Sequence, residues 1–465
     1  MTDAPAAEAD PTSPEPRPIS GLDDLLAPFY EAETPRTEWR VGTEAEKFGV
    51  RVDDGAPLPF LGEGGVRRVL SELAERHGWH EVQEVEGGEV IALRRSGASV
   101  TLEPGAQLEL SGAPQWCVHQ SVAELQGHDA ELRDLSKELG IVWLPVGFHP
   151  WALQDELPWV PKLRYGVMRE YLPTRGRRAL DMMRRTCTVQ ANLDYASEAD
   201  AFRKLAVSLR AQPIVGAMFA NAPFFEGQVT GRVSERIAVW NEVDPDRCGL
   251  LPFVWEGDGS YQRYVEWALD VPMFLVKRGG RVLRNTGQTF RTFLADGFQG
   301  ARATQEDWVT HLNTLFPEAR LKKTLELRGA DTQETHLLGA LPAIWKGLLY
   351  DDEALDAAAQ LLSRLDPAEA MASRAAIADG GLRAQLGGRE LAEWAAELCE
   401  IARAGLVRLD CRDRRGQDES VHLAPLIALV ARGMTPADAL LAEYRDAGEP
   451  PLRSWLVARG LRLRH

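Results

Sequence analysis

The chain has 465 residues and a formal net charge of -16 at pH 7, which allows a large buried core and argues against a nucleic-acid or membrane partner. Its five cysteines are odd in number and lack CxxC spacing, a pattern that indicates a reducing compartment, with neither a disulfide framework nor a zinc site. No run of about 18 apolar residues and no secretory leader occurs, so we expect a cytoplasmic protein that acts on small molecules as a monomer or weak homodimer.

The first part of the chain alternates helical segments with strands. Residues 1–20 are rich in Pro, Ala and acidic side chains and contain no aromatic residue, so we expect them to be disordered. Periodicity and turn residues then predict a helix at 21–31, a strand at 37–49, turns at 52–65, a helix at 66–77, a hairpin turning at Ser96-Gly97, a helix at 118–139 and a strand at 141–150. The hairpin would deliver Glu103.

Residues 151–173 contain three prolines, and we expect an irregular, substrate-facing loop that carries Arg164 and Tyr165. Further along we expect a strand at 185–195, a helix at 199–218, a strand at 251–255, a hairpin at 277–281, a helix at 305–316, a strand at 324–329, and helical runs near 337–349, 352–364, 367–378, 389–404 and 435–446. This order predicts an α+β protein, with a catalytic antiparallel-sheet domain at 21–335 and a helical region at 336–465 packed on the same domain.

Acidic residues alternate with apolar ones in TLEPGAQLELSGAP, residues 101–114. In an extended chain, successive side chains point to opposite faces. One face would hold Val100, Leu102, Leu108 and Leu110, and the other Glu103, Gln107 and Glu109. The apolar face can be buried, so the carboxylates are expected to line a wet surface.

The same alternation puts Glu44 and Glu46 on one face of the strand at 37–49. Carboxylates held this close repel each other, and a divalent cation between them would remove the repulsion. Hard oxygen ligands suit Mg²⁺ or Mn²⁺. We therefore also expect that Glu103→Gln and Glu326→Gln, which each remove one crowded charge of this kind, leave stability unchanged or raise it. The alternative is that these are ordinary solvated faces of amphipathic strands.

Two more strands carry polar faces of unusual composition. Gln190 and Asn192 alternate with apolar residues in RTCTVQANLDY, and Glu326 and Arg328 do so in TLELRG. Solvated faces usually include lysine, but these faces hold carboxylates, amides and guanidinium with no lysine. The set therefore favours the inside of a cup-shaped sheet over a solvated surface.

Several of these segments also resemble a known family. The motifs, in chain order, are VGTEAEKFG, LEPGAQLELSGAP, MMRRTCTVQANLDY, ANAPFFEG, DRCGLLPFVW, LDVPMF, LKKTLELRGAD and LPAIWKGLLYD. Together they resemble the plant-type glutamate-cysteine ligases (gamma-glutamylcysteine synthetases), a family shared by plants and bacteria. The resemblance runs from about residue 25 to the C-terminal helices.

The resemblance implies a glutamine-synthetase-like fold, an antiparallel cup-shaped β-sheet with packed helices and a helical C-terminal region. It also implies a reaction, the ATP-dependent ligation of the γ-carboxylate of L-glutamate to the amine of L-cysteine through a γ-glutamyl phosphate. The product, γ-glutamylcysteine, is the first intermediate of glutathione biosynthesis. ATP would bind through Mg²⁺ or Mn²⁺, because no glycine-rich phosphate loop is present in the sequence.

The resemblance further implies roles for individual residues. The metal ligands would be Glu44, Glu46, Glu103, Glu109 and Glu326. The catalytic residues would be Glu103, Arg247 and Arg328, and the substrate-binding residues Arg164, Tyr165, Arg185, Arg236, Gln190 and Asn192. Arginine suits these sites because its planar fork binds carboxylates and phosphates with two donors.

Two features depart from the family. Phe274 stands in LDVPMF where the family usually has tyrosine. One alternative is that Phe274 is a packing residue at which the side chain has drifted, and the other is that it lies at the amine-acceptor site. At that site we expect cysteine to remain the best acceptor, with weaker discrimination against other amines. The positions of the regulatory disulfides of plant members are occupied here by Val122 and Asn285. A thiol switch of that type cannot form in this chain.

Other functions stay open from sequence alone. A related carboxylate-amine ligase could use another amine, and a metal-dependent hydrolase could use the same carboxylates to activate water. A non-catalytic binding protein would not need five aligned acids. His119, His128 and His149 lack the spacing of a metal site. The products made from ATP, glutamate and an amine would separate these alternatives.

Overall fold

The computed structural model describes residues 17–256, 259–278 and 281–463. Within them, the main sheet has nine strands in the order β14-β15-β7-β1-β5-β4-β3-β2, with β6 also paired to β1. Every pairing in this sheet is antiparallel. Its strands are β1 Val41–Arg51, β2 His80–Gln83, β3 Val90–Arg95, β4 Ala98–Leu102, β5 Leu108–Ser111, β6 Ile141–Leu144, β7 Thr188–Leu193, β14 Ala319–Leu321 and β15 Leu325–Asp331.

The apolar face of the sheet forms part of the core. The predicted inward set, Val100, Leu102, Leu108 and Leu110, is 0 to 2% exposed. Four helices cover this face, α2 over β2 and β3, α3 over β1 and β6, α6 over β14 and β15, and α12 over β1 and β7. Their bounds are α2 Val66–His77, α3 Val118–Leu139, α6 Glu198–Met218 and α12 Ala340–Leu349. The alternation of side chains in the strands therefore determines which face is left free for a site.

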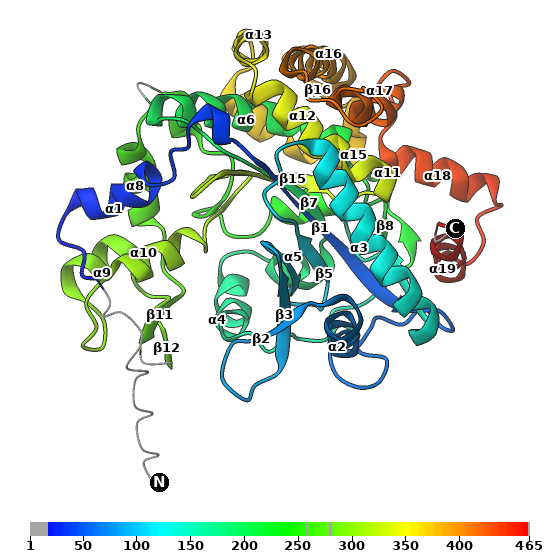
Figure 1. Ribbon diagram of the computed structural model, residues 1–465, viewed down its shortest axis with the longest axis horizontal. Coiled ribbons are helices and arrows are strands. Elements are labelled where there is room, and N and C mark those ends of the chain that lie inside the picture. Colours follow the sequence, from blue (N-terminus) through cyan, green and yellow to red (C-terminus); the bar gives the residue numbers. More distant parts are fainter. Residues whose placement is uncertain (1–16, 257–258, 279–280, 464–465) are drawn as a thin grey trace.

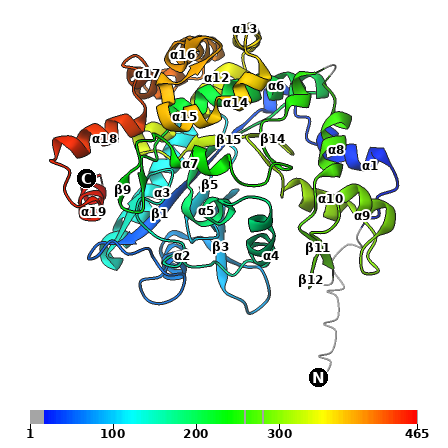
Figure 2. The same cartoon turned by 180° about the vertical axis from the view of Figure 1, so that it is seen from behind.

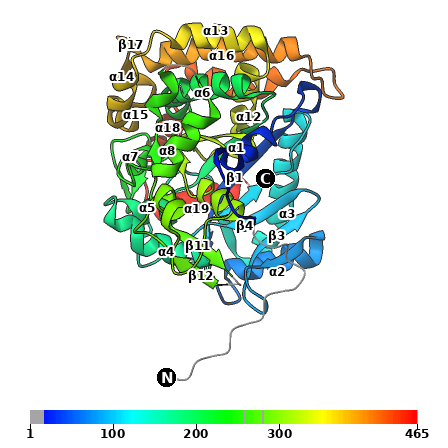
Figure 3. The same ribbon diagram turned by 90° about the vertical axis from the view of Figure 1, so that its left-hand side faces the viewer.

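A second layer of helices lies outside α6 and α12, where Figure 3 shows α13 and α16 at the top. The elements after residue 335 are α11 Thr335–Leu338, α13 Asp352–Leu362, α14 Pro367–Ala372, α15 Arg374–Gly380, η4 Gly381–Arg383, β16 Gln385–Leu386, β17 Arg389–Glu390, α16 Leu391–Leu409, η5 Glu419–Leu423, α17 Ala424–Val430, α18 Pro436–Asp446 and α19 Leu452–Arg462. They return to the sheet, because α19 packs on β6.

Short helices and hairpins surround the polar face, as Figures 1 and 2 show from opposite sides. They are α1 Leu22–Tyr30, η1 Arg36–Glu38, α4 Leu163–Tyr171, η2 Leu172–Thr174, α5 Ala179–Arg185, β8 Phe224–Phe225, β9 Gln228–Val229, α7 Glu235–Trp240, β10 Cys248–Gly249, η3 Pro252–Trp255, α8 Tyr261–Asp270, β11 Leu275–Arg278, β12 Arg281–Arg284, α9 Phe290–Asp296, α10 Gln305–Leu312 and β13 Phe316–Pro317. The described residues contain no helix long and apolar enough to cross a membrane.

The α+β antiparallel architecture confirms the fold class, and the helices at 66–77 and 118–139 match the prediction. Several element predictions were wrong in type or in extent. The helix expected at 367–378 is two short helices, α14 and α15, and the strand expected at 141–150 ends at Leu144 as β6. The expected loop at 151–173 contains α4, because its prolines lie outside the run from residue 162 to 172. The expected strand at 251–255 is the 3-10 helix η3, whose Pro252 cannot donate to a sheet and suits a first helical turn. The helix at 305–316 ends early, at Leu312.

The predicted N-terminal disorder is testable only in part. Residues 1–16 lie outside the described residues, as do Gly279 and Gly280 of the predicted hairpin turn. Residues 17–20 are ordered, because Pro18 forms a β-bridge with Thr304 and Ile19 N–H donates to Ala303 O. The helices α17 and α19 were not predicted from the sequence.

Candidate active site

The polar face of the sheet opens into a cavity of about 400 Å³. Strands β1, β5, β7 and β15 form its floor, while α4, α5 and α7 contribute to its walls. All five predicted metal ligands line it, namely Glu44, Glu46, Glu103, Glu109 and Glu326. The predicted cup therefore exists, and carboxylates that are far apart in the sequence meet within it.

Strand register explains how the carboxylates meet. Residues directly opposite each other on paired strands point to the same face. The facing pairs are Glu46 with Glu109, Glu44 with Gln190, and Glu326 with Asn192. Polar residues at matching parity on four strands thus form one continuous polar surface.

Glu46 and Glu109 lie in the acidic half of the cavity, where negative charges crowd together. Burial raises the pKa of Glu46 well above its usual value, and the charges of Glu103 and Glu109 raise it further. Burial, with the charges of Glu44 and Glu103, raises the pKa of Glu109 to about 8. Few donors compensate, although Thr188 N–H donates to Glu46 Oε2 at 2.9 Å. This half of the cavity favours bound protons or bound cations.

The other half of the cavity is basic. Glu326 contacts Arg320 at 2.6 Å, Lys322 at 3.2 Å and Arg328 at 3.3 Å. Burial alone would raise the pKa of Glu326, but these three cations outweigh it and hold the pKa well below its usual value. Glu326 is thus a compensated carboxylate, unlike those of the acidic half.

The sequence reasoning missed Arg320 and Lys322, both of which line the cavity. The expectation of a lysine-free polar face was therefore wrong. A signal was present, because Arg320, Lys322, Glu326 and Arg328 share one parity, and the register pairs Arg320 with Glu326 across the β14-β15 turn. Arg320 and Lys322 precede the strand predicted at 324–329, so the prediction does not include these two cations.

Helix α4 brings a tyrosine and two cations to Glu103. The Tyr165 hydroxyl donates to Leu102 O at 3.0 Å and lies 3.3 Å from Glu103 Oε1. The Arg164 guanidinium lies 5.1 Å from the centre of the Tyr165 ring. Lys162, also missed from sequence, donates to Leu102 O at 2.7 Å, and burial lowers its pKa. All three residues line the cavity, so a helix, not a loop, presents the predicted Arg164 and Tyr165.

Gln190 and Asn192 hold charged neighbours in place. Gln190 Oε1 accepts a hydrogen bond from Arg328 Nη1 at 2.9 Å and lies in the cavity wall. Asn192 is not part of the wall, but its Nδ2 donates to Glu44 Oε1 at 2.7 Å. Asn192 therefore acts on the cavity through Glu44.

Arg236 reaches the cavity from α7. Its Nη2 donates to Arg328 O at 2.8 Å, and its Nη1 donates to Gly329 O at 3.2 Å. Its Nε is buried and has no hydrogen-bond partner among the described residues. Burial lowers the pKa of Arg236, while the charge of Asp331 opposes that shift. One donor of this guanidinium is thus free for a ligand.

Arg247 and Phe274 do not line the cavity. Arg247 is fully buried, donates to Asp244 Oδ2 at 2.7 Å and Pro272 O at 2.8 Å, and lies 4.0 Å from the centre of the Phe274 ring. These contacts account for its charge within the protein. The structure therefore does not support the predicted position of Arg247 at a phosphate or of Phe274 at the acceptor site.

Arg185 also lies outside the cavity wall. Its Nη1 lies 3.2 Å from Asp181 and 3.3 Å from Glu226, and its guanidinium lies 4.8 Å from the centre of the Phe148 ring and 4.7 Å from that of Phe225. Its Nε and Nη2 are buried and have no hydrogen-bond partner among the described residues, so its substrate contact stays a prediction.

Comparison with known proteins identifies the family. The model of glutamate-cysteine ligase family 2 matches residues 40–454. The chain belongs to this family. Glutamate-cysteine ligase B, chloroplastic, of Oryza sativa subsp. japonica is 42% identical over 91% of this chain and 84% of its own length. The chloroplastic glutamate-cysteine ligase of Brassica juncea is 41% identical over 91% of this chain and 80% of its own length.

Solved structures support the fold of this glutamate-cysteine ligase family member. A glutamate-cysteine ligase from Francisella tularensis, in complex with AMP, has a TM-score of 0.59 and 13% identity, covering 92% of this chain and 88% of that one. A bifunctional glutathione synthetase from Pasteurella multocida has a TM-score of 0.53 and 14% identity, covering 95% of this chain and 54% of that one. The resemblance seen in the motifs is confirmed at the level of family and fold.

The donor set of this family member fits a divalent metal. Its acidic half gathers the carboxylates of Glu44, Glu46, Glu103 and Glu109, and hard cations such as Mg²⁺ prefer oxygen ligands. Burial and the neighbouring carboxylates raise the pKa values of Glu46 and Glu109. A bound cation would supply positive charge there.

Proposed function

We propose that this cavity joins the γ-carboxylate of L-glutamate to the amine of L-cysteine while ATP is converted to ADP and phosphate. The enzyme is a glutamate-cysteine ligase by family, and its relatives carry that name at about 41% identity. One observation carries the proposal at the level of the site. Four glutamates, Glu44, Glu46, Glu103 and Glu109, share one cavity with a cluster of Arg320, Lys322 and Arg328 that lies within 3.3 Å of the fifth, Glu326.

The chemistry requires the glutamate side chain to be activated first, because a carboxylate is a poor acyl donor. Transfer of the terminal phosphate of ATP gives a γ-glutamyl phosphate, which the cysteine amine attacks with loss of phosphate. Glu44, Glu46, Glu103, Glu109 and Glu326 would hold Mg²⁺ or Mn²⁺, which would supply positive charge to balance the phosphates of ATP. Metal-mediated binding of this kind would take the place of a glycine-rich phosphate-binding loop.

The cations of the basic half have a separate task. Lys322 and Arg328 lie within 3.3 Å of Glu326 and face the cavity, where they can donate to phosphate oxygens as negative charge develops. The arrangement is rigid, since Arg328 also donates to Gln190 at 2.9 Å. Donors fixed in advance need no reorganisation during the reaction.

The remaining arginines of the wall suit substrate carboxylates. Arg236 has an unpartnered buried Nε, and Arg164 stands at the wall beside Tyr165. Arg164 can bind the α-carboxylate of an amino acid with paired donors, and Arg236 can add a single donor through its Nε. These positions would orient the γ-carboxylate towards the phosphate.

The experiment is a coupled assay of ADP formation with glutamate and a panel of amines, combined with product identification. We expect ADP and γ-glutamylcysteine in equal amounts, dependent on Mg²⁺ or Mn²⁺. Glu103→Gln should reduce the rate by at least about a hundredfold through loss of a charge at the reacting groups. Glu86→Gln, at an exposed carboxylate, is the matched control and should keep the rate. Hydrolysis without ATP, or an inert response to cysteine with turnover of another amine, would refute the proposal.

We also infer a cytoplasmic location and a monomer or weak homodimer. All five cysteines are free, which is usual in a reducing compartment. Sedimentation at several protein concentrations, together with fractionation of the source cells, tests both points.

A further inference from the structure

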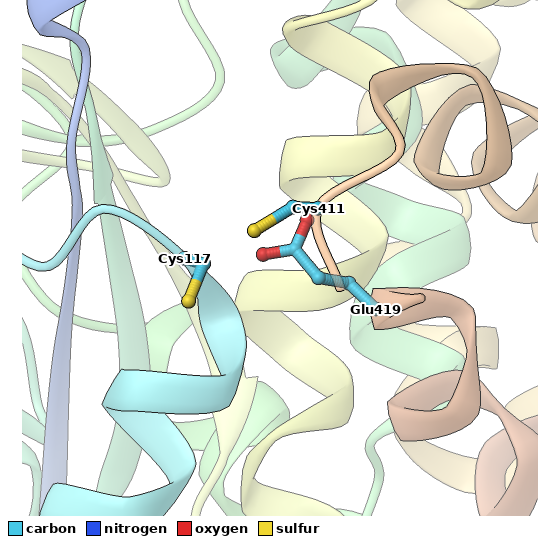
Figure 4. A group of neighbouring side chains, drawn as sticks. All are labelled: Cys117, Cys411 and Glu419. Atoms are coloured by element: carbon cyan, nitrogen blue, oxygen red, sulfur yellow. The ribbon is translucent and has the colours of Figure 1, made fainter. Parts of the chain in front are cut away.

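Three side chains outside the active-site cavity converge between α3 and the C-terminal helices. They are Cys117, just before α3, Cys411, just after α16, and Glu419 at the start of η5 (Figure 4). Their ligand atoms, two sulfurs and a carboxylate oxygen, lie within 4.8 Å of one another. No sequence motif predicts this cluster, because the two cysteines are far apart in the chain.

The carboxylate of this cluster is firmly held. Glu419 is 0% exposed, and its Oε1 accepts hydrogen bonds from Val118 N–H at 2.6 Å and Lys346 Nζ at 2.7 Å. Its Oε2 is buried and has no hydrogen-bond partner among the described residues, although it lies 2.7 Å from the Lys346 ammonium. Partners of this kind orient metal-ligating carboxylates in general.

We propose that Cys117, Cys411 and Glu419 form a binding site for a thiophilic divalent cation such as Zn²⁺. Zinc takes sulfur and oxygen ligands in a tetrahedral arrangement, and water can provide the fourth ligand. Cys411 is only half-buried, so the cation has access from solvent. This site is distinct from the carboxylate cavity, whose ligands are all oxygens and suit harder cations.

Charge balance supports a cation at this position. Without metal, the neutral thiols leave only the Glu419-Lys346 ion pair, which is neutral overall. With metal, two thiolates and one carboxylate carry three negative charges, and the divalent cation with Lys346 carries three positive charges. The buried cluster is thus neutral in both states, which avoids the cost of an unpaired buried charge.

Binding must be coupled to proton release. The two cysteines bind a metal as thiolates, so both thiols release their protons when the metal binds. Lower pH should therefore weaken binding. The neighbouring pair His119 and His422, with ring nitrogens 2.8 Å apart, is not part of the ligand cluster.

The consequence of binding would be structural. Val118 and Glu419 are 301 residues apart in the sequence, so a metal here fastens α3, which covers the catalytic sheet, to the C-terminal helices. A ligand that binds only the folded state raises stability. We expect Zn²⁺ to raise Tm by a few degrees in the wild type at a fixed excess over protein.

The test uses reduced, chelator-treated full-length protein with saturating Mg²⁺ to occupy the oxygen site. Equilibrium dialysis measures Zn²⁺ binding, and Co²⁺ serves as a spectroscopic probe because its thiolate complexes absorb strongly in the near ultraviolet. The variants are Cys117→Ser and Cys411→Ser, with Cys248→Ser as the matched control from outside the cluster. Metal-free Tm values show whether each variant is folded.

We expect wild type and Cys248→Ser to bind one equivalent of Zn²⁺ and to show the thiolate-cobalt band. Each cluster variant should lose at least about tenfold in affinity, together with the band and the zinc-dependent rise in Tm. The proposal is overturned if the wild type shows no such band, or if the band persists unchanged in both cluster variants. A reversible loss of two titratable thiols in air, with no Zn²⁺ binding after reduction, would identify a disulfide pair instead.

Discussion

Glu109 and Glu326 are buried carboxylates of one cavity, but their surroundings are opposite. Glu326 has three cations within 3.3 Å, whereas Glu109 is surrounded by other carboxylates that raise its pKa. Sequence reasoning treated all five acids alike and expected Glu103→Gln and Glu326→Gln to be neutral or stabilising. The structure limits that expectation to the acidic half.

We therefore predict opposite effects of two matched substitutions on the metal-free protein. Glu326→Gln leaves Arg320 and its neighbours without a buried counter-charge, so the free energy of unfolding should fall by about 3 kcal/mol. Glu109→Gln should not lower it. Chemical denaturation in the presence of a chelator measures both values, and a large loss in Glu109→Gln would contradict the assignment of repulsion.

The pH dependence of stability in Glu109→Gln tests whether the Glu109 carboxylate destabilises the folded protein when it is charged. A carboxyl group whose pKa is raised on folding stabilises the protein at low pH, and that stabilisation is lost as pH rises through the folded value. For Glu109 the folded pKa is about 8. The stabilisation is lost between the ordinary pKa of 4.5 and the folded value. Glu109→Gln should therefore gain stability relative to wild type as pH rises from about 4.5 to about 8 and show no further gain above that range, as measured by paired denaturation curves.

The LDVPMF motif predicts Phe274 at the amine-acceptor site, but Phe274 does not line the cavity. Its ring packs 4.0 Å from the Arg247 guanidinium and is 1% exposed. We predict that Phe274→Tyr leaves KM for cysteine unchanged, while Phe274→Leu lowers stability by about 1 to 3 kcal/mol through lost packing and cation-π contact. A lower KM in Phe274→Tyr would return the residue to the acceptor site.

Residue parity predicted the carboxylates because an alternating strand has only two faces. It could not predict what the loops and helices bring to those faces. Lys162 and Tyr165 reach Glu103 from α4, which sequence reasoning expected to be a loop. The contacts of Arg247 depend on Asp244 and Pro272, and no local pattern reveals them.

At the scale of elements, the turn between β4 and β5 determines where Glu103 lies. Gln107 bridges it to the neighbouring structure, accepting from Gly105 N–H at 2.8 Å and donating to Thr186 O at 3.0 Å. A Cβ at Gly105 would lie 2.5 Å from Arg184 O. This close approach requires glycine, because the backbone of α5 cannot yield without moving the wall.

We predict that Gly105→Ala reduces kcat by about tenfold or more, since it pushes the turn away from α5 and displaces Glu103. Ala106→Gly is the control, because Ala106 has a φ of 65° that glycine adopts freely. The control should keep kcat and change stability by less than about 1 kcal/mol. Steady-state kinetics and thermal melts on both variants decide whether the turn is a positioning element.

The elements that sequence reasoning predicted best are long and strongly periodic, such as α2 and α3. Those it missed are short and depend on tertiary contacts. In η3 the apolar run resembled a strand, but Pro252 removes a donor that a ladder would need. In α19 the helix is held by packing on β6, and its sequence alone has no clear boundary.

At the scale of the whole molecule, the C-terminal helices form part of the core of the sheet. Every residue of α12 is buried, and this helix covers β1 and β7, which carry Glu44, Glu46 and Gln190. Polar contacts continue the attachment, as Tyr350 bonds to Asp194 N–H at 2.7 Å and Arg36 pairs with Asp352 at 2.7 Å. The strands of the active site therefore have a face that these helices help to cover, together with α3 on β1 and α6 on β15.

We predict that the full chain unfolds in one cooperative transition and that a chain ending at residue 335 does not fold. The truncated chain lacks α12, so the apolar face of β1 and β7 would be exposed to water. The remaining core cannot replace the burial that is lost. The control is removal of residues 1–16, which composition predicts to be disordered and which should leave Tm unchanged. Calorimetry of the three chains tests the prediction. Residues 21–335 would form an independent domain if the full chain showed two separate transitions. The same conclusion would follow if the chain ending at residue 335 were soluble and melted cooperatively.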